Sequence, residues 1–225
     1  LGVLPLVRRP VGRGGWLWIV VVGLAMRLAL VRSTVILEDD LYRYFWDGAV
    51  VAAGLNPYRW APGEFADPAS APADAPPVLR DLAARSGNVI RRVNNAHLRS
   101  IYPAVAQGAF ALGHWAGAWS VPAWRGVLLG FELAALVLLV GLLRRLDLPA
   151  GQVAVYWWNP LLVKEIYNSG HLEVVAFPFA LGGLWLAIAN RHRLAAGLFA
   201  LGTGVKLWPV MLMGVLGRRL WGRPE

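Results

Sequence analysis

The sequence contains no cysteine and only two lysines, and just 16% of its 225 residues are charged. The absence of cysteine excludes a disulfide framework, a thiolate metal site and a thiol nucleophile. Soluble domains have about 25% charged and about 45–50% apolar residues, whereas apolar residues make up 57% of this chain. The chain has more apolar surface than its own interior can bury. This excess predicts lipid-facing helices and excludes a soluble cytosolic enzyme or a disordered tail.

The basic residues give a net charge of +9, and 20 of the 22 are arginine. A nucleic-acid surface would gather them on one face with aromatic residues between them. Instead they occur in pairs at the ends of apolar runs, which is the placement that fixes the orientation of membrane helices. The pairs are Arg8/Arg9, Arg144/Arg145, Arg191/Arg193 and Arg218/Arg219. The pattern therefore favours a polytopic integral membrane protein of the all-α class, built as a single domain over residues 1–225.

The first apolar run predicts a cytoplasmic tail over residues 1–15 and a transmembrane helix over residues 16–37. A secretory signal peptide has the same order of basic and apolar residues, but no small-x-small cleavage site follows here and further apolar runs do. Residues 38–100 differ in composition: the stretch 33–100 contains 8 of the 13 acidic residues and a segment rich in proline and alanine. We expect this region to be a large extracytoplasmic loop.

The remaining transmembrane helices are predicted within residues 124–217, in the runs 126–143, 152–163, 174–189 and 194–217. The last run is one long helix, or two short helices broken near Lys206 and Pro209. Residues 101–119 form either a spanning helix or a helix lying in the outer interface. The interfacial alternative is preferred because it places Arg144/Arg145 and Arg191/Arg193 on the cytoplasmic side.

One polar constellation stands where the first helix should leave the membrane: Glu38-Asp39-Asp40-Leu41-Tyr42-Arg43-Tyr44-Phe45-Trp46-Asp47-Gly48. On a helix, Asp40, Arg43 and Asp47 share one face. Adjacent carboxylates repel one another, which raises the pKa of one of them and suits it to act as a base. The structural alternative is that Asp39 or Asp40 caps the helix and that Arg43 forms ordinary ion pairs.

A second constellation runs from Trp158 to Glu173. Pro160 predicts a break in the helix, and ionisable residues at membrane depth mark a functional site by default. The alternative is that Lys164 extends to the interface and pairs with Glu165. His171 and Glu173 are two residues apart, so a helix does not place both on one face, and the sequence predicts no metal site.

These motifs resemble those of the GT-C superfold of lipid-linked-sugar transferases, and most closely the bacterial polyprenyl-phosphate-mannose-dependent mannosyltransferases of the glycosyltransferase family 87 type. The similar segments, in chain order, are Asp39-Asp40-Leu41-Tyr42-Arg43-Tyr44-Phe45-Trp46-Asp47-Gly48, Gly54-Leu55-Asn56-Pro57-Tyr58, Tyr102-Pro103-Ala104-Val105-Ala106-Gln107, Trp158-Asn159-Pro160, Asn168-Ser169-Gly170-His171 and Lys206-Leu207-Trp208-Pro209. Ala104 stands where the family usually has a second proline. The family is also longer, so the resemblance implies that the chain is incomplete at its C-terminus.

The resemblance implies transfer of a hexose, mannose by expectation, from a polyprenyl phosphate to an acceptor hydroxyl of a glycan or glycolipid at the outer face of the bacterial plasma membrane. It implies Asp40 as general base, with Asp39 as the competing carboxylate. The expected substrate-binding residues are Arg43, Asp47, Arg59, Arg99, Tyr102, Lys164, Asn168, His171, Glu173 and Lys206. No cofactor is expected, while a divalent cation requirement stays open. The competing hypotheses are a lipid or solute transporter or flippase, and a non-catalytic membrane subunit.

Overall fold

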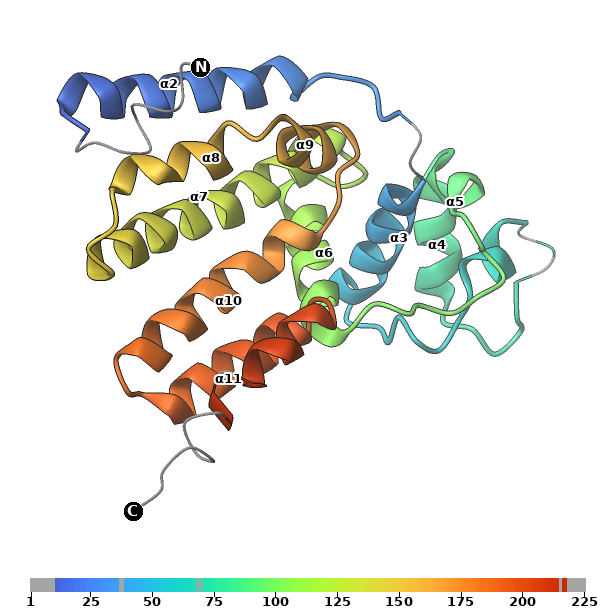
Figure 1. Ribbon diagram of the computed structural model, residues 1–225. Helices are drawn as coiled ribbons and strands as arrows, with labels where there is room; N and C mark the ends of the chain where they lie inside the picture. The colour runs from blue at the N-terminus through green and yellow to red at the C-terminus, as the bar shows by residue number, and fades with distance from the viewer. Residues whose placement is uncertain (1–10, 37–38, 68, 70, 215, 218–225) are drawn as a thin grey trace.

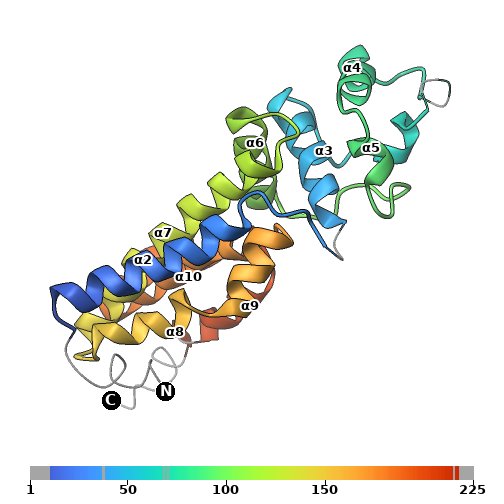
Figure 2. The ribbon, with the colours of Figure 1, turned by 90° about the horizontal axis from the view of Figure 1, so that it is seen from above.

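The computed structural model describes residues 11–36, 39–67, 69, 71–214 and 216–217. Every regular element in this described part of the chain is a helix, which confirms the all-α prediction. Figure 1 shows two parts: a bundle of longer helices, and a smaller lobe of short helices at one end of the bundle. Figure 2 shows the same division from above.

The bundle contains the long helices and the segment that connects them. Its elements are α2 (Arg13–Leu30), α7 (Val121–Arg145), η3 (Ala150–Gln152), α8 (Val153–Trp157), α9 (Pro160–Val163), the π-helical turn η4 (Lys164–Asn168), α10 (Glu173–Ile188), α11 (His192–Thr203) and η5 (Trp208–Leu212). By length and composition, α2 and α7 are long and apolar enough to cross a membrane, and α10 is a shorter apolar helix.

The described residues between 39 and 100 form the smaller lobe, called here the loop lobe. It contains α3 (Asp40–Ala52), η1 (Pro62–Phe65), α4 (Pro77–Arg85) and α5 (Val89–Arg92). Trp46, Phe65, Leu79 and Ile90 are buried together in a small apolar core. Because this core is separate from that of the bundle, the predicted loop is a folded unit with its own packed interior.

Helix α6 (Ala104–Ala116) lies between the loop lobe and the bundle, where it packs against both α3 and α7. The backbones of α3 and α6 approach so closely at Gly48 that a Cβ atom there would lie 2.4 Å from the carbonyl oxygen of Phe110. The 13 residues of α6 span about 20 Å, which is less than the hydrocarbon thickness of about 30 Å. This length favours the interfacial alternative for residues 101–119.

The first bundle helix is shorter than predicted, because α2 ends at Leu30 rather than near residue 37, which itself lies outside the described residues. The side chain of Arg125, from α7, donates hydrogen bonds of 2.8 and 2.9 Å to the carbonyl oxygens of Val31 and Ser33. Those carbonyl groups would have to accept from backbone N–H groups if the helix continued. The hydrogen bonds from Arg125 therefore take the place of the backbone hydrogen bonds that a further turn of α2 would make.

The helix break predicted at Pro160 is present, and the structure shows the broken alternative for the run 194–217. Helix α8 ends at Trp157, and Asn159 caps α9 by accepting a hydrogen bond of 2.9 Å from the backbone N–H of Leu161, with Pro160 at the first helical position. The run 194–217 is also broken, since α11 ends at Thr203 and η5 begins at Trp208. After this turn Leu212 and Leu216 pack with Ala195, so the chain runs back along α11.

The two ends of the bundle differ in charge. At the end away from the loop lobe, Arg144 of α7 lies over the ring of Trp16 of α2, and Arg145 lies over Trp185 of α10. The turn that contains Arg191 and joins α10 to α11 is at the same end (Figure 1). We call this the basic end. Arg8, Arg9, Arg218 and Arg219 lie outside the described residues.

A buried ion pair connects three elements inside the bundle. Arg27 of α2 and Glu132 of α7 are paired, with 2.7 Å between Nε and Oε2, and both side chains are almost completely buried. The hydroxyl group of Tyr167 in η4 donates to the same carboxylate over 2.6 Å. Glu132 is therefore a buried hydrogen-bonding partner of both Arg27 and Tyr167.

Candidate active site

Helix α3 forms as predicted and presents Asp40, Arg43 and Asp47 to one neighbouring segment. Asp40 accepts a hydrogen bond of 2.9 Å from the side chain of Asn94. Arg43 donates bonds of 3.0 Å to the carbonyl oxygens of Asn95 and Leu98. The three side chains thus share one helical face, and this face lies against residues 94–107.

Asp40 is half-buried at the first position of α3, where the helix dipole stabilises a negative charge. Two tyrosines lie within range of its charge. Burial and the negative charge of Asp40 raise the pKa of Tyr102, and burial raises the pKa of Tyr44 with smaller contributions from Tyr102 and Asp40. Both phenols are therefore neutral hydrogen-bond donors beside a carboxylate.

Asp39 does not make the predicted capping interaction. It occupies the N-cap position of α3, but its side chain forms no capping hydrogen bond and is exposed. Its backbone carbonyl, rather than its carboxylate, accepts a hydrogen bond from the backbone N–H of Tyr42 over 3.1 Å. The half-buried carboxylate with side-chain partners at this helix terminus is Asp40.

Asp47 is 1% exposed and lies deeper along the same face. Its Oδ2 atom accepts hydrogen bonds from the hydroxyl group of Ser100 and, over 3.2 Å, from the side-chain amide of Gln107. Burial raises the pKa of Asp47, while the hydrogen bonds from Ser100 and Gln107 and the charge of Arg43 lower it less. Its contacts connect α3 with the start of α6 and do not reach an open surface.

Arg43 was expected to bind phosphate, but the structure gives it other partners. Its side chain is 5% exposed, and its guanidinium group donates to backbone carbonyl groups of residues 94–98. In this conformation it holds the segment that carries Asn94, the partner of Asp40.

The segment 164–173 adds an ionic cluster. Glu165 accepts from the ammonium group of Lys164 over 2.9 Å and lies 2.9 Å from Nδ1 of His171. The ion pair between Lys164 and Glu165, which was the structural alternative to a functional role for Lys164, is therefore present, and Lys164 is partly exposed. The turn that follows is fixed by the indole of Trp124, which donates to the carbonyl oxygen of Gly170 over 2.7 Å.

Asn168 has a structural position. It is 5% exposed and donates to the hydroxyl group of Ser33 (3.1 Å) and to the carbonyl oxygen of Thr34 (2.7 Å), and it accepts from the backbone N–H of Ile36. These contacts fix residues 33–36, which lead into the loop lobe. Asn168 was predicted to bind substrate, but its hydrogen-bonding groups are occupied by the chain itself.

Lys206 and Glu173 form an ion pair between the turn after α11 and the start of α10. The second carboxylate oxygen of Glu173 is buried and has no hydrogen-bond partner among the described residues. The carbonyl oxygen of Gly204 accepts from the backbone N–H groups of Val105 and Ala106, so this turn also contacts the start of α6.

The structure therefore brings together residues from four of the predicted motifs. Gly170 lies beside Leu41 of α3, because a Cβ atom at Gly170 would be 3.2 Å from the Leu41 side chain. The charge of Glu173, like that of Asp40, acts on the hydroxyl group of Tyr44. We define the candidate site as Asp40, Tyr44, Tyr102, His171, Glu173 and Lys206, at the bundle end that faces the loop lobe.

Two further predicted site residues, Arg59 and Arg99, also lie outside this arrangement. Arg59 is exposed, lies 3.9 Å from the carboxylate of Asp74 and stacks on Trp60. Arg99 is exposed in the segment that precedes Tyr102. The turn that contains Tyr58 does contact the site, because the hydroxyl group of Tyr58 donates to the backbone carbonyl of Tyr102 over 2.8 Å.

Sequence reasoning missed the partners of the acidic residues, namely Asn94, Ser100 and Gln107. They are single polar residues 50 to 60 positions away from α3, and no local spacing connects them to it. For Tyr44 the sequence does hold a signal, because it stands four residues after Asp40, which is about one helical turn.

Chemically, the site offers a half-buried carboxylate, neutral phenols, an imidazole paired with a carboxylate, and a partly exposed ammonium group. The described residues include no cluster of three or more histidine, aspartate or glutamate side chains that could hold a metal ion. Comparison of the chain with protein-family models, with curated proteins and with solved structures gives no match.

Proposed function

We propose that the chain is a membrane-embedded glycosyltransferase that moves a hexose from a polyprenyl phosphate to an acceptor hydroxyl. The observation that carries the proposal is the convergence of Asp40, Glu173 and Lys206 at one end of an apolar helical bundle. These residues come from three motifs that are far apart in the sequence. A carboxylate and a cation at such a position suit a donor whose anionic group is anchored in lipid.

The proposed orientation follows from the two ends of the bundle. Helix α2 has 18 residues and α7 has 25, which correspond to about 27 Å and about 37 Å, close to or above the hydrocarbon thickness of about 30 Å. The basic end faces the cytoplasm in this proposal, by the positive-inside tendency. The candidate site and the loop lobe then face the extracytoplasmic side.

In the proposed reaction, Asp40 removes the proton from the acceptor hydroxyl. The acceptor oxygen forms a bond to the anomeric carbon as the bond from that carbon to the phosphate oxygen breaks. The polyprenyl phosphate leaves as an anion, and positioned cations stabilise the charge that develops on it. Asn94 donates to one oxygen of Asp40, and the hydroxyl group of Tyr102 also interacts with this carboxylate, so both side chains position Asp40 to take the proton.

The cations assigned to the donor phosphate are Lys206 and Lys164. Each is partly exposed and paired with one carboxylate, to Glu173 and Glu165 respectively, so an incoming phosphate can compete for it. Arg43 is assigned a positioning role instead, because its guanidinium group holds residues 94–98. The unpartnered oxygen of Glu173 is assigned to a sugar hydroxyl, since an unsatisfied buried acceptor is costly.

Membranes that contain the full chain should transfer radiolabelled mannose from polyprenyl phosphate to an endogenous glycan or glycolipid. Matched membranes without the chain should not. If the label crosses the bilayer on an unaltered donor lipid, with no new glycosidic product, the chain is a flippase and the proposal is wrong.

A further inference from the structure

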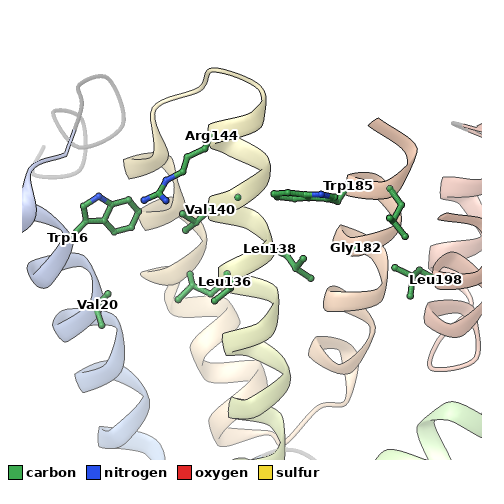
Figure 3. A pocket seen from close by; sticks show the side chains of 12 residues that line it. Trp16, Val20, Leu136, Leu138, Val140, Arg144, Gly182, Trp185 and Leu198 are labelled. Carbon is green, nitrogen blue, oxygen red and sulfur yellow. The ribbon is translucent and has the colours of Figure 1, made fainter. Parts of the chain in front are cut away.

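A large apolar groove runs along α7 at the basic end of the bundle. Its volume is about 660 Å³, within the range of roughly 300–1,000 Å³ that is typical of small-molecule sites. Helix α7 contributes its floor through Leu136 and Val140, and α2 and α10 contribute Trp16 and Trp185 on either side (Figure 3).

The lining of the groove is hydrocarbon, and part of it is open. Val137, on the floor, is 72% exposed, and Val20 of α2 is also exposed. At the membrane location proposed above, these exposed side chains face the acyl chains of the lipid. A groove without polar groups along its floor suits an acyl chain rather than a sugar or a nucleotide.

Arg144 lines the end of the groove, and a second cation, Arg145, lies over Trp185 on the other side. Arg144 extends toward Trp16, and its charge lies over that indole ring. The Arg144 side chain is exposed and forms no ion pair with an acidic residue in the part of the chain that the structure describes. Basic pockets between membrane helices on the cytoplasmic side are the sites that anionic lipid headgroups bind.

We infer that this groove binds an anionic phospholipid, with one acyl chain along α7 and the headgroup phosphate at Arg144. The inference rests on the membrane location proposed above but not on glycosyl transfer. Residues 121 and 144 of α7 are about 35 Å apart along the helix, so this site lies at the opposite end of the bundle from Asp40. It is therefore separate from the proposed site of the donor phosphate.

The test is native mass spectrometry of the purified full chain in detergent, with added phosphatidylglycerol or with phosphatidylcholine of the same acyl chains. We expect phosphatidylglycerol to be retained preferentially. Arg144→Ala should reduce that preference about five-fold, as expected for one arginine near an anionic headgroup. Arg13→Ala removes the same charge at the same end of the bundle, outside the groove, and should change the preference much less.

A second pair of variants tests the acyl chain. Val137→Trp fills the floor of the groove and should reduce retention of both lipids, whereas Leu133→Trp, one helical turn away outside the groove, should not. Thermal unfolding followed by tryptophan fluorescence checks that each variant is folded.

Three results would overturn the inference. They are equal retention of the two lipids, no effect of Arg144→Ala on the preference, and displacement of phosphatidylglycerol by polyprenyl phosphate at this groove. The first result would leave the groove to a neutral lipid or another protein segment, and the last would assign it to the donor lipid. Glycosyl transfer is measured separately, so failure of lipid binding and failure of the proposed reaction are distinguishable.

Discussion

Replacement of Arg27 by methionine should destabilise the bundle strongly. The substitution keeps most of the side-chain volume but leaves the carboxylate of Glu132, which is completely buried, without its cation. Removal of one partner of a buried ion pair costs about 3–5 kcal/mol. In a chain of this size about 1 kcal/mol corresponds to roughly 2–4 °C in Tm. The expected decrease is therefore on the order of 10 °C.

Thermal unfolding in detergent, followed by tryptophan fluorescence, measures this decrease. The double variant Arg27→Met/Glu132→Leu should recover part of the loss, because it removes the unpaired buried carboxylate. The recovery is incomplete because the buried hydroxyl group of Tyr167 loses its acceptor, which costs about 1–3 kcal/mol. Arg13→Met, at the exposed start of the same helix, should change stability by no more than about 0.5 kcal/mol. The role assigned to Arg27 is refuted if Arg27→Met has the same Tm as the wild type, or if the double variant has a Tm as low as that of Arg27→Met.

Three further predictions concern the candidate site and its orientation. Burial raises the pKa of Asp47, so its native state retains a proton that the unfolded chain releases near pH 4. The contribution of Asp47 to stability should therefore be fully present below that pH and be lost as pH rises through its folded pKa, and Asp47→Asn should remove this contribution to the pH dependence of thermal unfolding. Lys164→Ala should raise the KM for the lipid donor, and Lys164→Arg should restore it in part. An unchanged KM would mean that Lys164 only pairs with Glu165 and does not bind the donor phosphate. A cysteine at Leu207, which is exposed beside the candidate site, should react with an impermeant reagent applied outside intact cells. A cysteine at Leu148, exposed near the basic end, should not, and the reverse pattern would invert the proposed orientation.

The sequence was informative wherever the signal is local. Pro160 predicted a break because proline cannot donate the backbone hydrogen bond that a helix needs, and Pro209 made a break one of the two alternatives for the run 194–217. The three-residue spacing of Asp40 and Arg43 predicted a shared helical face, and the structure has that face.

The sequence was uninformative where a side chain meets backbone from another element. The end of α2 depends on Arg125, 95 residues after Leu30 in the chain, and Arg43 binds carbonyl groups that carry no sequence signature. The role of Asn168 was missed for the same reason, because its partners are in residues 33–36. Asparagine and arginine bind backbone and ligands with the same groups, so only the fold separates the two uses.

The most direct test of the central claim compares two adjacent carboxylates. Asp40→Asn should accumulate in membranes at the wild-type level, yet lose about 10²–10⁴-fold in the rate of mannose transfer, the typical cost of removing a general base. Asp39→Asn is the matched control: it removes an exposed charge one residue away and should retain most of the activity. If Asp40→Asn transfers mannose at nearly the wild-type rate, Asp40 is not the base and the proposed site is wrong.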